Sequence, residues 1–417
     1  MSTRLKILIC GGGCAGPALA FWLAKAGHHV TVVERFPALR ATGAQIDIRA
    51  QGIEVVRRMG LMDAVRSKLV DEDGFALVDS SGRARATVLA NKSGKGSQSI
   101  TSEFEIMRGD FVRLLYEETE KLGVHYLFGL TVDRFEDGDG GVTVHLSDGT
   151  SGVYDLLVGA DGQGSRIRKA ILPPGAHPYR HLGFYTAYWF MPASAEDKTR
   201  PKLLRAYHMP GGRAVLTRNS TAETQVYFNL RDSDPALRDL ARGPPEQQKA
   251  FWESRFRGGG GETERCLAGL RATDNFYSHE VVQVRAETWR RGGRVVLLGD
   301  AAHCPTPLTG VGTTGALVGA YVLAGEIGRS PDDLPAALAR YETTLRPFVD
   351  NLQTVYPLFL RMLLPDSRWA IGLLRFVLGM ICWLRVPELA ARLIGEERGG
   401  WKLPDYPESQ SSAEGGL

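Results

Sequence analysis

A run of glycines separates a short apolar segment from a helical one near the start of the chain. Gly11, Gly13 and Gly16 fit the pattern GxGxxG, with the apolar run KILIC before them and a helical stretch after them. The segment HVTVVE then reads as a second strand that ends on Glu34. The first glycine permits a tight turn, the second lets a pyrophosphate approach the backbone, and the third lets the helix pack on the strand. The pattern predicts a βαβ unit with parallel strands that binds a dinucleotide, with Glu34 as the acceptor for a ribose hydroxyl.

The order of strand-like and helical patterns further along the chain predicts an insertion. Three strand-like runs between residues 124 and 160 are joined through DGDGG and DGT, which are typical of hairpin turns. Residues 184–230 alternate apolar and polar positions, a buried strand returns at 294–298, and helices dominate from 314 onward. We therefore expect an α/β protein: a Rossmann-like nucleotide-binding domain, an inserted, mostly antiparallel β-sheet domain, and C-terminal helices.

Local signals predict several shorter elements. We expect a loop and then a helix over residues 43–68, a hairpin turn at SSGR (80–83), and a mobile loop at the polar, glycine-rich stretch 91–99. Asp110 is a candidate N-cap for a helix that extends to Leu122.

Composition excludes several classes of function. The 417 residues suffice for two or three domains, and 50 basic against 47 acidic residues give a net charge of only +3, which does not favour nucleic acid. The five cysteines are odd in number and form no CxxC pair, so neither a disulfide framework nor a metal site is expected. A reducing, cytoplasmic compartment and a monomer are the expectation, and the apolar run at residues 6–10 is too short for a signal peptide.

One apolar stretch requires a membrane test. Residues 369–384 are mostly apolar, but they number 16, contain Arg375 and precede Pro387. A spanning helix needs about 20 apolar residues. We expect a helix docked on the protein body, with peripheral membrane contact as the alternative.

A second match to GxGxxG, at residues 310–315, does not predict another βαβ unit. Some eleven residues separate it from the strand at 294–298, so the strand-turn-helix arrangement is missing. It indicates a loop before a helix at about 313–327, whose N-terminus could face a developing negative charge.

Two more motifs complete a family pattern. LLVGADGQGSRIR contains Asp161, and RVVLLGDAAHCPTPLTGVGTTGALVGA contains Asp300. With GGGCAG, they make most of residues 5–330 resemble the flavoprotein monooxygenases of the para-hydroxybenzoate hydroxylase type. The resemblance implies an FAD-binding domain at 1–75, 100–180 and 278–350, a substrate domain at 76–99 and 181–277, and a C-terminal helical segment at 351–417.

The resemblance also implies roles for single residues. Asp300 would hold the ribityl chain of FAD, Pro307 would lie beside the reactive face, and Arg108 would contact the flavin. Asp161 would support both FAD and the nicotinamide cofactor. Thr313 stands where the family often has Asn, so a side-chain contact there would not be equivalent. The cofactor-binding residues implied are Gly11, Gly13, Ala15, Gly16, Glu34, Arg35, Arg40, Asp47, Arg108, Asp161, Asp300, Pro307, Gly310, Gly312 and Thr313.

One subgroup is nearer in pattern. ATGAQIDIRAQGIEVVRRMGL is similar to the corresponding segment of the tetracycline-inactivating monooxygenases. That similarity implies that Asp47 contacts FAD and Arg40 contacts NADPH, while Glu34 and Arg35 hold the adenosine ribose. Arg213, in GGRAVL, would match a substrate-contacting arginine.

Simpler structural roles stay open for several of these residues. Asp161 and Asp300 are also typical turn residues after strands, and Arg108 could be a charge at a helix start. His303 fits a local hydrogen bond as well as a catalytic base. The cluster of Tyr185, Tyr188, Trp189 and Phe190 could line a pocket or form sheet core.

The resemblance implies a reaction. NADPH (or NADH) would reduce FAD, and the reduced flavin would react with O2 to give a C4a-hydroperoxide that hydroxylates a small organic substrate. No catalytic side chain, metal or second dinucleotide motif is required. Three alternatives stay open. The first is a flavin-dependent halogenase, but the chain lacks the tryptophan-isoleucine-proline signature of that group. The others, a dehydrogenase or reductase without oxygenation and a non-catalytic FAD-binding protein, would look similar in sequence.

Overall fold

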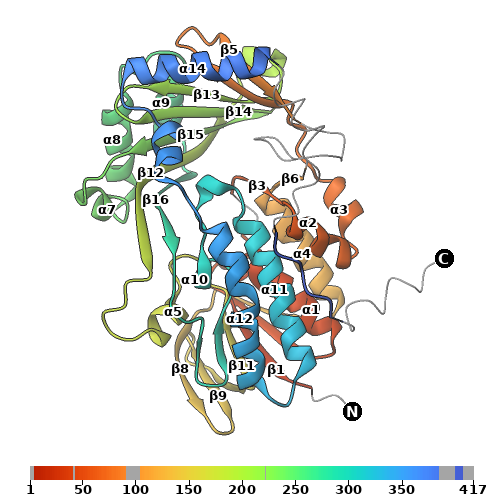
Figure 1. Cartoon of the computed structure of the whole chain (residues 1–417). Coiled ribbons are helices and arrows are strands. Elements are labelled where there is room, and N and C mark those ends of the chain that lie inside the picture. Colours follow the sequence, from red (N-terminus) through yellow and green to blue (C-terminus); the bar gives the residue numbers. More distant parts are fainter. Residues whose placement is uncertain (1–3, 41–42, 91–103, 221, 385–399, 407–417) are drawn as a thin grey trace, which may run out of the picture.

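The computed structural model describes residues 4–40, 43–90, 104–220, 222–384 and 400–406. Two sheets form the two parts of the molecule, and the long strands β12 and β16 extend from one part toward the other (Figure 1). The first sheet consists, in spatial order, of β17 (Arg290–Arg291), β18 (Val295–Leu297), β11 (Leu156–Gly159), β1 (Lys6–Cys10), β2 (His29–Glu34) and β7 (His125–Phe128). Its neighbours are parallel except β17 and β18. The predicted βαβ unit is confirmed.

Helices and a small second sheet cover this sheet, so that Ile7, Leu8 and Ile9 of β1 are fully buried. Parallel strands buried on both faces are continuous apolar runs, as KILIC is. The helices of this part are α1 (Ala15–Lys25), α2 (Gln51–Arg58), α3 (Met62–Arg66), α4 (Arg108–Lys121), α5 (Arg166–Ile171), α10 (Asp300–His303), α11 (Gly312–Arg329) and α12 (Leu334–Leu352). The small sheet contains β8 (Val132–Gly138), β9 (Gly141–Leu146) and β10 (Ser151–Tyr154), and a separate pair joins β3 (Gln45–Asp47) to β6 (Glu105–Met107).

The second large sheet has seven strands and is antiparallel apart from one neighbour pair. Its strands, in spatial order, are β16 (Phe276–Val284), β12 (Tyr179–Pro192), β15 (Glu223–Arg231), β14 (Arg213–Asn219), β13 (Leu203–Met209), β4 (Gly74–Val78) and β5 (Ala84–Leu89). Only β13 and β4 are parallel. The antiparallel middle of the chain is therefore confirmed, while the exact domain boundaries stay a prediction.

The two faces of the seven-stranded sheet differ. Helices α7 (Ala236–Leu240), α8 (Pro245–Phe256) and α9 (Thr263–Ala272) cover one face, where Trp189, Phe228 and Trp252 form a buried core. The other face points toward the six-stranded part, and it also carries α13 (Pro357–Leu363) and α14 (Arg368–Trp383). Period-two alternation along each strand thus sends every second side chain to the helices and the others to the space between the sheets.

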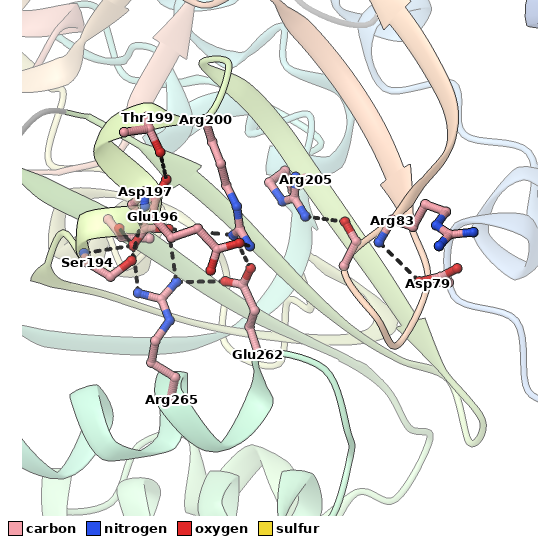
Figure 2. Close-up of polar contacts among 12 residues, drawn as sticks. Asp79, Arg83, Ser194, Glu196, Asp197, Thr199, Arg200, Arg205, Glu262 and Arg265 are labelled. Atoms are coloured by element: carbon pink, nitrogen blue, oxygen red, sulfur yellow. Dashed lines mark hydrogen bonds and ion pairs between the residues drawn. The ribbon is translucent and has the colours of Figure 1, made fainter.

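An ion-pair network fastens α6 (Ala195–Thr199) to α9 (Figure 2). Asp197 accepts hydrogen bonds from the Ser194 N–H (3.0 Å) and from Arg265 Nη1 (2.7 Å), and Glu262 pairs with both Arg265 and Arg200. Burial opposes ionisation of Asp197, but these hydrogen bonds hold its pKa below the usual value. The network thus links α6 to the start of α9, and the cavity beside it measures only about 20 Å³.

Several local predictions are confirmed and one is wrong. The hairpins β4–β5, β8–β9 and β9–β10 and the helix after residue 312 form as expected. Asp110 is not an N-cap, because α4 begins two residues earlier, at Arg108, where β6 leads directly into it. The predicted loop before α2 contains the short strand β3. The stretch 91–99, predicted as a loop, lies outside the described residues.

Candidate functional site

A cavity of about 640 Å³ lies between the two large sheets. Gly13 follows β1, Ala160 follows β11 and Asp300 follows β18, so three neighbouring parallel strands end at this cavity. Ligands of open parallel sheets bind at the carboxyl ends of the strands. The opposite wall consists of side chains from the seven-stranded sheet.

The glycine loop after β1 has the geometry that the sequence pattern predicts. Gly11 has φ +121°, and a Cβ there would lie 2.3 Å from the Ala160 carbonyl oxygen. A Cβ on Gly16 would lie 2.0 Å from the Gly11 oxygen, so α1 can approach β1 this closely only with glycine. Within the described chain, Cys14 caps α1 with no side-chain hydrogen bond. The first N–H groups of α1 are therefore available beside Gly13 and Ala15, which line the cavity.

The segment after β18 supplies a second stretch of this wall. Asp300 begins α10 and faces the cavity, where enclosure by protein raises the pKa of its carboxyl group while a hydrogen bond from Cys304 and the charge of Arg108 oppose the rise. Pro307, Gly310, Gly312 and Thr313 all line the cavity as well. Helix α11 starts at Gly312, so its N-terminus also opens here.

A cationic rim lies beside the glycine loop. Glu34 accepts hydrogen bonds from the N–H groups of Gly12 (2.7 Å) and Phe36 (3.1 Å). The guanidinium groups of Arg35 and Arg40 lie 4.9 and 4.8 Å from the centre of the Phe36 ring. Arg40 and Arg108 both line the cavity, and Arg108 donates to the Arg40 carbonyl oxygen at 3.4 Å. Exposed Arg35 stands outside the lining that the described residues form.

Two predicted carboxylates occupy different positions. Asp47 lines the cavity, and a Cβ on Gly310 would come within 2.8 Å of its Oδ2. Asp161 does not reach the lining, although its neighbours Ala160 and Gly162 do. Its Oδ2 accepts from the Arg166 N–H (2.7 Å) in the first turn of α5, whose N-cap is Ser165.

The wall opposite these segments is polar and aromatic. It presents, from β12, β14, β15 and β16, the side chains of Thr186, Tyr188, Leu216, Arg218, Tyr227, Asn229, His279 and Val281. The Tyr188 and Tyr227 rings lie 4.9 Å apart, and burial raises the pKa of Tyr227 to about 12. Burial lowers the pKa of His279 to about 4, so the His279 ring is neutral at physiological pH.

Arg218 is the central charge of this wall. It pairs with Glu105 and Glu72, and it donates a hydrogen bond to Gln45. Both carboxylates are buried, with 4% and 6% of their side chains exposed. Two buried carboxylates share one guanidinium, so burial and the mutual repulsion outweigh the attraction to Arg218 and raise the pKa of Glu72 to about 8. The pair therefore holds a proton at neutral pH.

The raised pKa of Glu72 predicts that the stability of the protein depends on pH. Because the pKa of Glu72 is higher in the folded than in the unfolded chain, its contribution is full below about pH 4.5 and is lost as the pH rises through about 8. Glu72→Gln keeps the neutral shape, so we expect Tm at pH 8 to rise by roughly 2–6 °C while Tm at pH 5 changes little. Thermal unfolding from pH 5 to 8.5 measures this. The exposed Glu117→Gln serves as the control, and parallel curves for Glu72→Gln and wild type would contradict the assignment.

The structure places the predicted substrate-contacting arginine, Arg213, outside the described cavity lining. Arg213 and Arg218 lie on the same strand, but five positions apart they point to opposite faces. Arg213 donates to the carbonyl oxygens of Pro210 and Arg255 and stacks on Phe256, on the helix-covered face. Arg213 is therefore not brought to the cavity, and Arg218 is.

The other open assignments divide by strand alternation or burial. Tyr188 lines the cavity, whereas Tyr185 and Trp189 belong to the core beneath α8 and α9. His303 is buried against Trp289 and is absent from the cavity lining that the described residues form, which favours the local structural role.

Sequence reasoning missed most of the polar wall. The alternation in RAVLTRN and in ETQVYFNLR carried a signal, because it places Arg218, Tyr227 and Asn229 on one face. Glu72 and Glu105 had no such signal, since they reach Arg218 only through tertiary packing.

The cavity wall formed by the segments after β1, β11 and β18, which we call the cofactor wall, has residues that fit FAD. Two helix N-termini, those of α1 and α11, present N–H groups to one cavity, Asp300 faces it, and the glycine turn leaves room for a pyrophosphate. Asp47 Oδ1 has no hydrogen-bond partner among the described residues, as expected for a group that awaits a ligand.

Comparisons with known proteins agree with this fit. Residues 4–353 match the family described as FAD binding domain. The chain is 41% identical to the FAD-dependent monooxygenase asL4 of Sarocladium schorii (97% of this chain, 99% of that protein) and 40% identical to the flavin-dependent monooxygenase eupH of a Phoma species (90% and 92%). The crystal structure of the tetracycline destructase Tet(55) has a TM-score of 0.78 and 27% identity, and covers 97% of this chain and 100% of that one. The chain belongs to the FAD binding domain family, and within it to the FAD-dependent, NAD(P)H-using monooxygenases.

Proposed function

We propose that this monooxygenase hydroxylates a polycyclic phenolic or polyketide-like substrate, a class that includes tetracyclines. One observation carries the proposal: a single cavity has cofactor-binding backbone on one wall and an Arg218-centred, tyrosine-rich wall on the other. FAD, when bound, supplies the acceptance of hydride and the activation of oxygen. The structural likeness to a tetracycline destructase supports a fused-ring substrate.

The chain's own residues would orient the substrate and exclude water. Arg218 and Tyr227 offer a cation and a hydroxyl to phenolic or enolic oxygens. Leu216 and Val281 would pack against the rings, and the N-terminus of α11 would stabilise negative charge that develops at the cofactor. We propose that the cofactor contacts those of the predicted residues that line the cavity. Arg35 would act at the rim of the cavity, and Asp161 would act indirectly, through the loop that precedes α5.

Arg40 would select the reductant. Its guanidinium lies at the rim, between the rings of Phe36 (4.8 Å) and Tyr277 (6.0 Å), where it can reach a 2′-phosphate. We expect Arg40→Ala to raise KM for NADPH by roughly 10–100-fold and to leave KM for NADH nearly unchanged, because a charge-assisted hydrogen bond is lost. Steady-state kinetics with both reductants measure this, and Arg113→Ala, an exposed arginine on α4, is the control. Equal losses with NADPH and NADH would rule out a 2′-phosphate contact.

We also propose that the protein acts as a monomer in the cytoplasm. Support comes from the five free cysteines, which suit a reducing compartment.

A substrate screen tests the proposed function. Purified, FAD-loaded protein is mixed with NADPH and with fused-ring phenols, including a tetracycline, and NADPH loss is followed beside mass spectrometry. We expect stimulated NADPH oxidation and a product heavier by one oxygen atom. Stimulated oxidation without an oxygenated product would indicate a dehydrogenase or reductase, and no NADPH oxidation would indicate a non-catalytic flavoprotein.

A further inference from the structure

Helix α14 carries large apolar side chains all round, with two arginines among them, although the described chain covers only one of its faces. Leu374, Leu378 and Cys382 pack against Leu77 and Ala206 of the seven-stranded sheet. The opposite side, which we call the outer face, carries the exposed residues Trp369, Leu373, Phe376, Val377, Met380 and Trp383. A helix that is hydrophobic all round normally lies in a protein core or in lipid. Figure 1 shows α14 against the seven-stranded sheet, at the end of the molecule distant from the six-stranded part.

The outer face is a continuous stripe with aromatic ends. Trp369, Leu373, Phe376, Met380 and Trp383 follow one another at intervals of three or four, and Val377 lies one turn after Leu373, so all six lie on one side of the helix. Trp369 and Trp383, each 76% exposed, stand at the two ends, about 21 Å apart along the axis. Tryptophan is enriched where apolar and aqueous phases meet, because its ring is apolar and its N–H is polar.

The charges of this segment have one sign. Residues 367–384 contain Arg368 and Arg375 and no Asp or Glu. Arg375 donates to the Val78 carbonyl oxygen, and Arg368 is exposed at the first turn. At 16 residues α14 is too short to span a bilayer, and a search of the described helices finds none that could do so.

We propose that the outer face of α14 binds the surface of an anionic phospholipid bilayer, with the helix axis parallel to the membrane. Amphipathic helices bind this way when aromatic and aliphatic side chains enter the interface and basic residues meet anionic headgroups. In α14, the side opposite the outer face packs against the seven-stranded sheet, where an isolated amphipathic helix would have a polar face. A protein interface normally carries about one hydrogen bond per 100–200 Å², whereas the outer face offers only the two indole N–H groups, which favours lipid over a second copy. Leu216 packs near α14 and also lines the cavity, so the bilayer would lie close to the wall that contains Arg218 and Tyr227, which we call the substrate wall.

Vesicle flotation tests this proposal. FAD-loaded protein is mixed with vesicles of phosphatidylcholine alone or with 30 mol% phosphatidylserine, at low and at high salt. We expect binding to both, stronger on anionic vesicles by roughly fivefold for the exposed Arg368, since one arginine near such a surface adds about that factor. Arg368→Gln removes the preference. Phe376→Glu lowers the partition coefficient at least tenfold, while flavin content and NADPH oxidation stay at the wild-type level.

Val153→Glu provides the matched control, because Val153 is also an exposed apolar residue (52%) but lies on β10 in the other part of the molecule. It should bind vesicles as wild type does. Wild-type protein that does not float with either vesicle overturns the proposal. So does a solution dimer, seen by analytical ultracentrifugation, that Phe376→Glu dissociates while no vesicle binding occurs, since the outer face is then an interface between copies.

Discussion

Gly16→Ala is expected to yield protein almost free of FAD. The new Cβ would lie 2.0 Å from the Gly11 carbonyl oxygen, a backbone atom that cannot move aside without separating α1 from β1. That separation shifts the first N–H groups of α1, which lie where the pyrophosphate would bind. Overpacking of this kind costs roughly 1–3 kcal/mol, so flavin affinity should fall by roughly 10–100-fold. The visible absorbance spectrum of purified protein, titrated with FAD, measures the loss.

Gly140→Ala is the matched control. Gly140 lies in the β8–β9 turn, a Cβ there meets no atom within 4 Å, and its φ is not in the left-handed region. We expect wild-type flavin content. A Gly16→Ala variant that retains FAD would show that the helix does not need this approach to bind the cofactor.

Arg218→Met is expected to abolish substrate-stimulated turnover. The substitution removes the one cation that the described residues present on the cavity wall opposite the cofactor wall, and it leaves Glu72 and Glu105 buried without their partner. Loss of one partner of a buried ion pair costs roughly 3–5 kcal/mol of stability. Loss of charge-assisted hydrogen bonds to the substrate lowers kcat/KM by roughly 10–200-fold. NADPH oxidation with and without substrate, together with thermal unfolding, measures both effects.

Two further variants separate folding from function. The triple variant Arg218→Met, Glu72→Gln, Glu105→Gln has no unpaired carboxylate in the cluster, so it should regain stability but not turnover. Arg213→Met, on the same strand but on the helix-covered face, should keep kcat/KM within about twofold, since no transition-state contact is removed. A large loss of kcat/KM for Arg213→Met, with little loss for Arg218→Met, would instead place the substrate on the helix-covered face of the sheet.

The cofactor wall was largely predictable from sequence because local geometry determines it. Gly16 approaches Gly11 of the same βαβ unit, and Glu34 ends the adjoining strand, although Gly11 itself approaches Ala160 after β11. Asp300 belongs to a motif of contiguous residues, so its place follows once its strand joins the sheet. Asp161 was harder to assign, since the same side chain can cap a helix or contact a ligand.

The substrate wall was not predictable in the same way. Arg218 meets Glu105 and Glu72 across 113 and 146 positions of chain, and no periodic pattern records such a contact. The choice between Arg213 and Arg218 depended on which face of β14 the helices cover, which is a tertiary property. The same applies to α14: its apolar sequence predicted a docked helix, but not that six large apolar side chains face outward.

Isotope incorporation tests monooxygenation most directly. FAD-loaded protein turns over its best fused-ring substrate with NADPH under ¹⁸O₂ in ordinary water, while NADPH loss and O2 uptake are followed together. We expect one labelled oxygen atom in each product molecule and equal consumption of NADPH and O2. An unlabelled product, or NADPH oxidation that proceeds equally well without O2, would contradict the account.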